Sequence, residues 1–286
     1  MGVGFAAVLA AVFAAAATGL SGAVAVLERR SAPVPSLTLA SALACIALLA
    51  LAGTSLMQLG RPQLIFAAFS NPASSIFKLG VAWIVALAAC AAYLAAIHRA
   101  AYESTCRKLA LIASVAAALV LMAHASNYVM PWRAAWNTWS IVLPFFGYAA
   151  LIGVATMGLV GAVHGYALDR RVSLAAGGFA VFGLALYLLI VGGTDAVEPT
   201  ASRVLTGDLA TWFWGLTVGA GVVLPWGLTL LARQSRVALT AALFAALVGC
   251  AGWQIVVLRL GSAAIGKGIM APTAQEVEDY EKAWND

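Results

Sequence analysis

The stretch VGFAAVLAAVFAAAATGLSGAVAV, residues 3–26, contains no charged side chain. An apolar run of this length can cross the hydrocarbon core of a membrane as one α-helix, which needs about 20 residues. No positively charged segment precedes the run, and it is too long for the apolar core of a secretory signal peptide. We therefore interpret it as a retained first membrane helix.

The rest of the chain repeats this pattern. Of its 286 residues, 63% are hydrophobic and 9% are charged, whereas about 25% of the residues of a soluble domain are charged. The strands of a membrane barrel would be about 10 residues long and would alternate in polarity, so the long apolar runs favour helices. The sequence predicts an all-α polytopic membrane protein with a bundle of eight transmembrane helices within residues 1–262 and a polar C-terminal tail at 263–286. The predicted spans are roughly 3–27, 37–58, 76–97, 108–130, 140–166, 173–193, 210–232 and 238–262.

The basic residues are distributed unevenly between the two sets of connections. The four short connections after the odd-numbered spans carry nine of them: Arg29, Arg30, Arg99, Arg107, Lys108, Arg170, Arg171, Arg233 and Arg236. The opposite side carries six: Arg61, Lys78, Arg133, Arg203, Lys267 and Lys282. By the positive-inside rule the short connections are cytoplasmic, so both termini lie on the outer (periplasmic) side of a bacterial or archaeal inner membrane. Basic residues scattered over helix ends do not indicate a nucleic-acid partner.

The connection between spans two and three is unusually long and polar. It reads MQLGRPQLIFAAFSNPASSIFK, residues 57–78, and Gly60 and Pro62 are expected to end the preceding helix. Apolar residues then recur at near-helical spacing, which predicts a short interfacial helix at about 62–70. This connection is either a functional surface or a loop that only joins two helices.

Two further outer connections carry distinctive residues. SNYVMPWRAAWNTWS, residues 126–140, is rich in tryptophan, and Trp139 fits the aromatic belt of a membrane interface. DAVEPTASRVLTGD, residues 195–208, is acidic. The tail ends in EVEDYEKAWND, which is expected to be solvated or to contact a partner.

Small residues recur on two spans. Such spacing lets membrane helices approach closely, so these residues are expected to serve packing: Gly153, Gly158, Gly161, Gly165, Gly215 and Gly219. The four cysteines are far apart and form no C-x-x-C pair, which argues against a zinc site or an iron–sulfur cluster in this chain: Cys45, Cys90, Cys106 and Cys250.

The acidic residues all fall in loops, at helix ends or in the tail. Ion-coupled transporters place carboxylates inside the membrane, so a proton relay is disfavoured, although transport of a small neutral solute remains an alternative. Arg259 is the one strong charge within a predicted span. It either extends to the outer interface or lines a site for a polar ligand.

The histidines divide between the two sides of the membrane. His98 and His164 are predicted near cytoplasmic helix ends, where a single haem between them is conceivable. His124 lies on the outer half of span four, on the same side as Gln58, Arg61, Tyr128, Arg133 and Arg259. It is either a hydrogen-bonded packing residue or a proton acceptor in a binding site.

Three stretches resemble the DmsC family of membrane anchor subunits of dimethyl sulfoxide reductase-type molybdoenzymes, within the wider NrfD-like group. LGRPQLIFAAFSNPASSIF, residues 59–77, is similar to the family pattern of Leu-Gly-x-Pro, an interfacial helix and an asparagine. Residues 127–153, with Trp-Asn-Thr at 136–138, resemble the connection into the fifth span. VLRLGSAAIGKGIM, residues 257–270, resembles the end of the last span.

This resemblance implies a function in anaerobic respiration. Such an anchor oxidises menaquinol or a similar quinol near the outer face. It passes the electrons to a four-cluster, ferredoxin-like iron–sulfur subunit, which supplies a molybdopterin catalytic subunit. Terminal catalysis would lie in that other chain, and this chain would bind membrane lipid but no haem or iron–sulfur cluster of its own.

The resemblance and the residue types together suggest two sets of site residues. The candidate quinol-binding residues are Gln58, Arg61, His124, Tyr128, Arg259 and Lys267. The candidate partner-docking residues are Pro62, Asn71, Trp132, Arg133, Trp136 and Asn137. The chain departs from the family pattern at two places: Gln58 replaces a histidine, and Lys78, Leu79 and Gly80 stand where the family has a glutamate.

Overall fold

The computed structural model describes residues 3–58, 70–72, 74–99, 102–130, 134–165, 168–193, 200–231 and 235–267, with side chains up to residue 261. The interfacial helix predicted at about 62–70 lies outside these ranges, except for Ser70 in a turn. The described residues form helices, turns and short irregular segments, and no strand occurs among them.

Within these ranges, eight helices are long and apolar enough to cross a membrane, which confirms the predicted all-α class and the predicted number of long apolar helices. They are α1 (Val3–Arg29), α2 (Val34–Gln58), α4 (Ser75–His98), α5 (Glu103–Ser126), α6 (Val142–His164), α7 (Arg170–Gly192), the π-helix η4 (Trp212–Val223) continuing into α9 (Leu224–Leu231), and α10 (Arg236–Lys267). Shorter elements are η2 (Ala134–Trp136), η3 (Trp139–Ile141) and α8 (Thr200–Leu205). Helix α10 continues five residues past the predicted end at 262.

Local sequence signals set several helix ends. The backbone N–H of Phe77 donates to Ser74 Oγ (3.1 Å) at the start of α4, and that of Arg171 donates to Asp169 Oδ1 (2.9 Å) at the start of α7. These side chains satisfy amide groups that have no partner within the helix. Helix α6 ends at Gly165, whose φ of 79° lies in the left-handed region that glycine adopts without strain.

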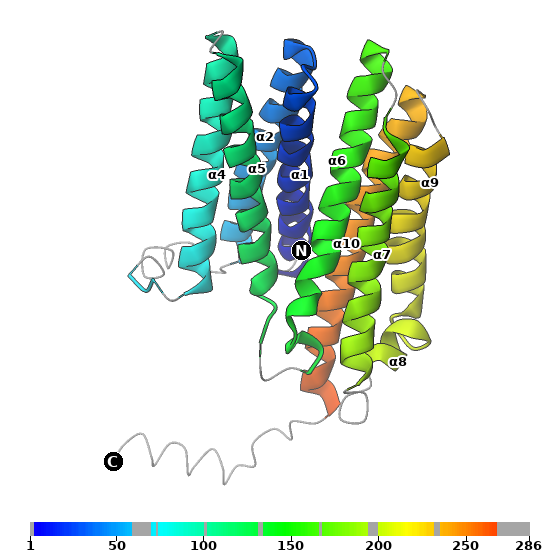
Figure 1. Ribbon diagram of the computed structural model, residues 1–286. Coiled ribbons are helices and arrows are strands. Elements are labelled where there is room, and N and C mark those ends of the chain that lie inside the picture. Colours follow the sequence, from blue (N-terminus) through cyan, green and yellow to red (C-terminus); the bar gives the residue numbers. More distant parts are fainter. Residues whose placement is uncertain are drawn as a thin grey trace.

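Helices α1 and α6 form the centre of the bundle. Helix α1 contacts α2, α5, α6 and α10, with α2, α4 and α5 on one side of it and α6, α7, α9 and α10 on the other (Figure 1). The two central helices approach closely at Gly19 and Gly153: a Cβ on Gly153 would lie 2.9 Å from the carbonyl oxygen of Gly19. Close backbone approach at small residues is the usual way in which membrane helices associate.

The predicted packing glycines behave unequally. Gly153 and Gly158 lie against Gly19 and the Leu239 side chain, respectively, as expected of packing residues. Gly215, by contrast, faces open space, so its predicted packing role is wrong. The close approach of the seventh span to α10 instead occurs at Gly221, against Gly249.

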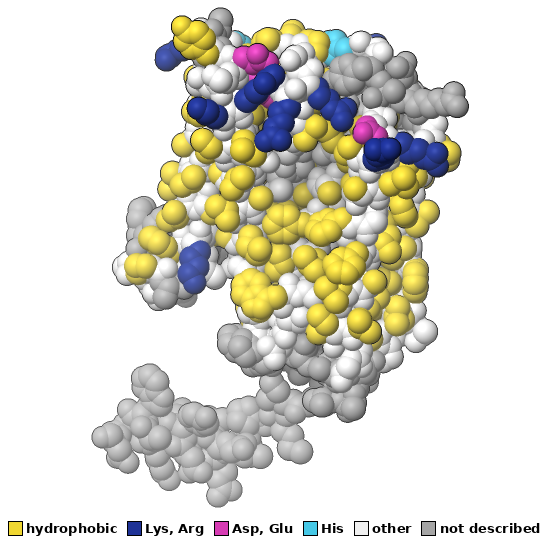
Figure 2. All heavy atoms as spheres, viewed as in Figure 1, with side chains coloured by type: hydrophobic (Ala, Val, Ile, Leu, Met, Phe, Trp, Pro, Cys, Tyr) yellow, Lys and Arg dark blue, Asp and Glu magenta, His cyan; other side chains and the backbone are white. Residues whose placement is uncertain are grey.

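The two ends of the bundle differ in charge. Basic side chains gather at one end, above a wide hydrophobic band (Figure 2). The helix ends flanking the four basic connections all lie at that end in Figure 1, as predicted. The opposite end holds the start of α1, the end of α2, the start of α4 and the end of α5 (Figure 1).

Candidate functional site

A cavity of about 440 Å³, here called the polar pocket, lies at the end of the bundle opposite the basic connections. It opens between the C-terminal ends of α2 and α5 and the N-terminal half of α4. Its lining residues are Leu51, Ala52, Ser55, Leu56, Gln58, Ser75, Ile76, Leu79, Gly80, Trp83, Ile84, His124, Asn127 and Met130. The volume is in the range of small-molecule sites, and most of the wall is apolar.

Three lining residues carry buried polar atoms without a hydrogen-bond partner in the structure as described. These atoms are Ser55 Oγ, His124 Nε2 and Asn127 Oδ1. A buried polar atom left unpaired costs about 1–3 kcal/mol, so each of these atoms favours a partner such as a water molecule or a ligand. Their convergence on one cavity indicates a ligand that donates or accepts hydrogen bonds.

The imidazole of His124 is held by neighbouring rings. The side chain is 2% exposed, and its ring packs edge-to-face against Tyr128 at 5.9 Å and Phe145 at 6.3 Å between centroids. Behind it, Gln254 Nε2 donates to the Tyr128 hydroxyl at 2.6 Å. Burial raises the pKa of Tyr128 to about 12, so its hydroxyl stays neutral. These contacts fix where the unpaired Nε2 of His124 lies.

Two other residues shape the pocket wall. The Trp83 indole N–H donates to the Leu48 carbonyl oxygen at 2.6 Å and so joins α4 to α2. Gln58 lies at the C-terminal end of α2, and its amide nitrogen makes only a long contact of 3.5 Å with the Thr54 carbonyl oxygen. A contact at this limit leaves the Gln58 amide able to turn toward a ligand.

Buried aromatic residues attach the segment before η3 to the bundle. The Trp136 indole N–H donates to the Val257 carbonyl oxygen at 3.0 Å, and the Tyr187 hydroxyl donates to the Ala135 carbonyl oxygen at 2.9 Å. Trp136 is 9% exposed and packs on Tyr128. Its side chain therefore supports the wall behind His124, whereas the predicted docking role would need this side chain to be exposed. The adjacent Asn137 is exposed.

The structure brings together part of the predicted quinol-binding set. Gln58 and His124 line the same pocket, and Tyr128 lies directly behind His124. Arg259 is elsewhere: it is exposed on α10, with its guanidinium 5.0 Å from the Trp212 ring centroid in η4. The cation–π contact stabilises the guanidinium near the membrane, and Arg259 is not among the residues that line the polar pocket.

The remaining predicted residues divide into two groups. Asn71 is exposed, in the short described segment before α4. Arg61, Pro62, Trp132 and Arg133 lie outside the residues that the structure describes, and Lys267 is described only as the last residue of α10.

Several pocket residues had no signal in the sequence. Ser55, Asn127 and Trp83 are single polar or aromatic residues in or beside apolar runs. Gln254 is fully buried in α10, and only its hydrogen bond to the Tyr128 hydroxyl in the structure connects it with the pocket. Polar residues within predicted spans would have been the one usable indication.

The basic end of the bundle holds the other two histidines. His98 ends α4, and His164 ends α6 with its Nε2 2.5 Å from Ser36 Oγ. Nearby, the buried Glu28 carboxylate accepts a hydrogen bond from the Tyr93 hydroxyl at 2.6 Å. Over the described ranges, no three His, Cys, Asp or Glu side chains are grouped as metal ligands would be.

No family model matches this chain, and no curated protein matches it significantly.

Proposed function

We propose that this protein is the quinol-binding membrane anchor subunit of a molybdoenzyme-type oxidoreductase complex. The observation that carries the proposal is the polar pocket, a mostly apolar chamber whose lining residues Ser55, His124 and Asn127 each have a buried polar atom without a partner in the described structure. A quinol has the complementary chemistry, because it combines an aromatic ring and an apolar tail with two ring hydroxyls.

The pocket can support oxidation of a quinol to a quinone. The reaction removes two electrons and two protons, and each hydroxyl needs an acceptor within hydrogen-bond reach. The Nε2 of His124 accepts one proton, Asn127 Oδ1 or Ser55 Oγ orients the other hydroxyl, and the second proton leaves to water at the outer end of the pocket. Trp83, Leu79 and Ile84 supply apolar contacts for the ring and exclude water. The electrons pass to the partner iron–sulfur subunit.

The charge distribution supports placing the pocket on the outer side of a bacterial or archaeal inner membrane. The pocket lies at the end opposite the basic connections, which the positive-inside rule makes cytoplasmic. An iron–sulfur subunit would then dock on the outer face, close enough to the pocket to receive electrons. Asn71 and Asn137 are exposed at that end.

Copurification tests this proposal against solute transport. We expect the chain, extracted from its native membrane in mild detergent, to copurify with an iron–sulfur subunit and a molybdenum-containing subunit, and the complex to be reduced by a menaquinol analogue. A monodisperse single chain that moves a small solute into vesicles and binds no quinone would overturn the assignment.

A further inference from the structure

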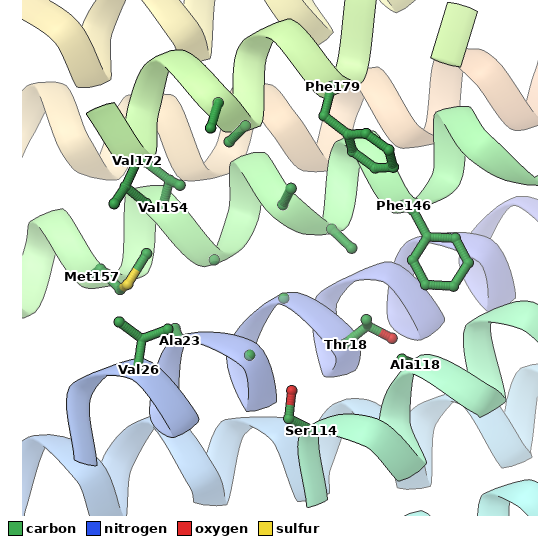
Figure 3. A pocket seen from close by; sticks show the side chains of 17 residues that line it. Thr18, Ala23, Val26, Ser114, Ala118, Phe146, Val154, Met157, Val172 and Phe179 are labelled. Atoms are coloured by element: carbon green, nitrogen blue, oxygen red, sulfur yellow. The ribbon is translucent and has the colours of Figure 1, made fainter. Parts of the chain in front are cut away.

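A second cavity, here called the apolar groove, lies between α1, α5, α6 and α7 and measures about 460 Å³ (Figure 3). Small residues line much of it, including Gly22 and Ala118. Phe146 and Phe179 lie at one end of the cavity in Figure 3, and Val26 and Met157 lie toward the other.

The groove offers a ligand almost no unpaired polar group. The Thr18 hydroxyl is already in contact with the carbonyl oxygens of Ala14 (2.9 Å) and Ala117 (2.8 Å). Ser114 is the one other polar side chain among the described lining residues, and the rest are apolar or glycine. The chemistry of the wall therefore selects hydrocarbon.

The depth of the groove matches one leaflet of a membrane. On α1 the lining residues run from Thr18 to Val26, and the helix ends at Arg29. At 1.5 Å per residue, Thr18 lies about 16 Å from Arg29 along the helix axis, roughly half of a 30 Å hydrocarbon core. A transmembrane helix of a partner would need a groove over the full height, whereas a lipid acyl chain occupies one leaflet.

Three arginines continue the groove-lining stripes to the basic end. Arg29 follows Gly22 by two helical turns, Arg107 precedes Ser114 by two turns, and Arg171 precedes Ala175 by about one turn. All three are exposed. Figure 2 shows basic side chains gathered at this end, over a recess in the hydrophobic band between α5 and α7.

Three acidic side chains lie at this end without reversing the local charge; one of them, Glu28, is buried beside Arg29 and accepts a hydrogen bond from the Tyr93 hydroxyl. Glu103 pairs with Arg107, and the Asp169 carboxylate accepts the backbone N–H of Arg171. Three more basic residues, Arg30, Lys108 and Arg170, are at the same end. The six positive charges exceed the three negative ones, so the mouth of the groove favours an anion.

We propose that the apolar groove binds an anionic phospholipid of the leaflet at the basic end. One acyl chain occupies the groove, and the phosphate group lies among Arg29, Arg107 and Arg171. Guanidinium groups bind phosphate oxygens in a bidentate manner, and basic pockets between membrane helices favour anionic head groups. This proposal is independent of quinol binding in the polar pocket.

Lipid retention tests the charge requirement. The protein, with any subunits that copurify, is reconstituted into bilayers of equal parts phosphatidylglycerol and phosphatidylcholine, extracted in mild detergent and examined by native mass spectrometry. Each basic residue contributes about fivefold to binding at an anionic surface. We therefore expect the combined change Arg29→Gln, Arg107→Gln and Arg171→Gln to reduce the preference for phosphatidylglycerol by on the order of tenfold or more.

A matched variant removes the same charge away from the groove-lining stripes: Arg30→Gln, Lys108→Gln and Arg170→Gln. We expect it to retain most of the preference. Equal retention of the two lipids by the unaltered protein, or equal losses in the two triple variants, would overturn the proposal.

A groove-filling variant tests the acyl-chain site separately. A Cβ on Gly22 would meet only Ser114 Oγ, at 3.9 Å, so the side chain of Gly22→Leu can enter the cavity without a backbone clash. We expect it to lose the retained phospholipid. Gly178→Leu, on α7 where a Cβ meets nothing within 4 Å, is the control and should retain it. Equal phospholipid retention by the two variants would show that lipid is not the occupant of the groove. The same conclusion would follow if Gly22→Leu changed the oligomeric state of the protein and left the retained phospholipid unchanged.

Discussion

The polar pocket and the apolar groove have nearly the same volume, about 440 and 460 Å³, but their walls are chemically different. The pocket contains three buried polar atoms without partners in the described structure, whereas the groove's Thr18 hydroxyl is already satisfied by carbonyl groups. The comparison teaches that volume does not select a ligand in this bundle. The pairing state of a few buried polar atoms does, because each unpaired atom favours a ligand that supplies its partner.

The same helix contributes to both cavities. Helix α5 lines the groove with Ser114 and Ala118, whereas His124 and the C-cap residue Asn127, about two to four turns farther along, line the pocket. The difference therefore arises from a few side chains and their position along the helix. Exchanging those side chains should exchange the behaviour of the cavities.

The largest expected effect is that of His124→Leu. Removing the proton acceptor should reduce quinol-driven reduction of the partner's clusters by about 100-fold or more, because general acid–base groups typically contribute 10²–10⁴-fold. Thermal stability should be unchanged or slightly higher, since Nε2 has no partner in the described structure that would be lost. His98→Leu, at the basic end, is the control. Full activity of His124→Leu would exclude His124 from the site.

A smaller effect should follow from making the pocket resemble the groove. The double variant Ser55→Ala, Asn127→Leu removes two unpaired polar atoms, each worth about 0.5–1.5 kcal/mol in a hydrogen bond to a ligand. Quinone affinity, measured by titration of the purified complex, should fall by about tenfold. Ser114→Ala in the groove should leave that affinity unchanged. If both variants bind quinone equally well, the polar atoms do not distinguish the two cavities.

Trp83→Phe should weaken quinone binding by about two- to fivefold. It keeps an aromatic ring in the wall but removes the N–H that donates to the Leu48 carbonyl oxygen, a bond worth about 0.5–1 kcal/mol. The ring would then be held less firmly between α4 and α2. Trp139→Phe provides the comparison, because Trp139 is 64% exposed and lies outside the pocket. The same titration measures the quinone affinity of the two variants. An equal change in affinity for Trp83→Phe and Trp139→Phe would exclude a role for the Trp83 hydrogen bond.

The smallest effect concerns an ion pair outside both cavities. Arg203 donates to both carboxylate oxygens of Asp208, at 2.9 and 2.8 Å, and this holds the pKa of Asp208 below its usual value. The stabilisation is therefore present above the ordinary aspartate pKa and is lost as the pH falls through the lowered value of the folded state. Because Asp208 is mostly exposed, Asp208→Asn should cost less than about 1 kcal/mol.

Thermal unfolding in detergent at neutral and strongly acidic pH measures this difference. We expect the gap between the unaltered protein and Asp208→Asn to disappear at the acidic pH, and quinone and phospholipid binding to be equal in both. A gap that persists in acid would assign the effect to packing and not to charge.

Much of the fold could be predicted because the thickness of the membrane sets the length of each apolar segment, and that length can be seen in a short stretch of sequence. Each apolar run had to be about 20 residues long, so hydropathy located all eight spans to within a few residues. The same count of spans placed Gln58 and His124 at one end of the bundle, and both line the polar pocket. The glycine prediction was less successful, since Gly215 faces open space while Gly221 makes the close contact.

The candidate site could be predicted only in part because contacts between helices are not local. Arg259 shares an end with His124 in the sequence argument, but its position on α10 brings it to Trp212 instead of the pocket. Trp136 was predicted to be a docking residue, but its indole N–H donates to the Val257 carbonyl oxygen in the interior of the bundle. Ser55 and Asn127 are far from each other in the sequence, and only the fold shows that they line the same cavity as His124.

The sequence alone determined that this chain is a bundle of membrane-spanning helices with one basic end, since segment length and the positions of charges relative to apolar runs decide both. The tertiary structure decided which helices are neighbours: α2, α4 and α5 around the polar pocket, and α1, α5, α6 and α7 around the apolar groove. The physical reason is that lipid is as apolar as the helices, so their association depends on shape and on a few polar contacts, such as Gly19 against Gly153 and Trp83 with Leu48.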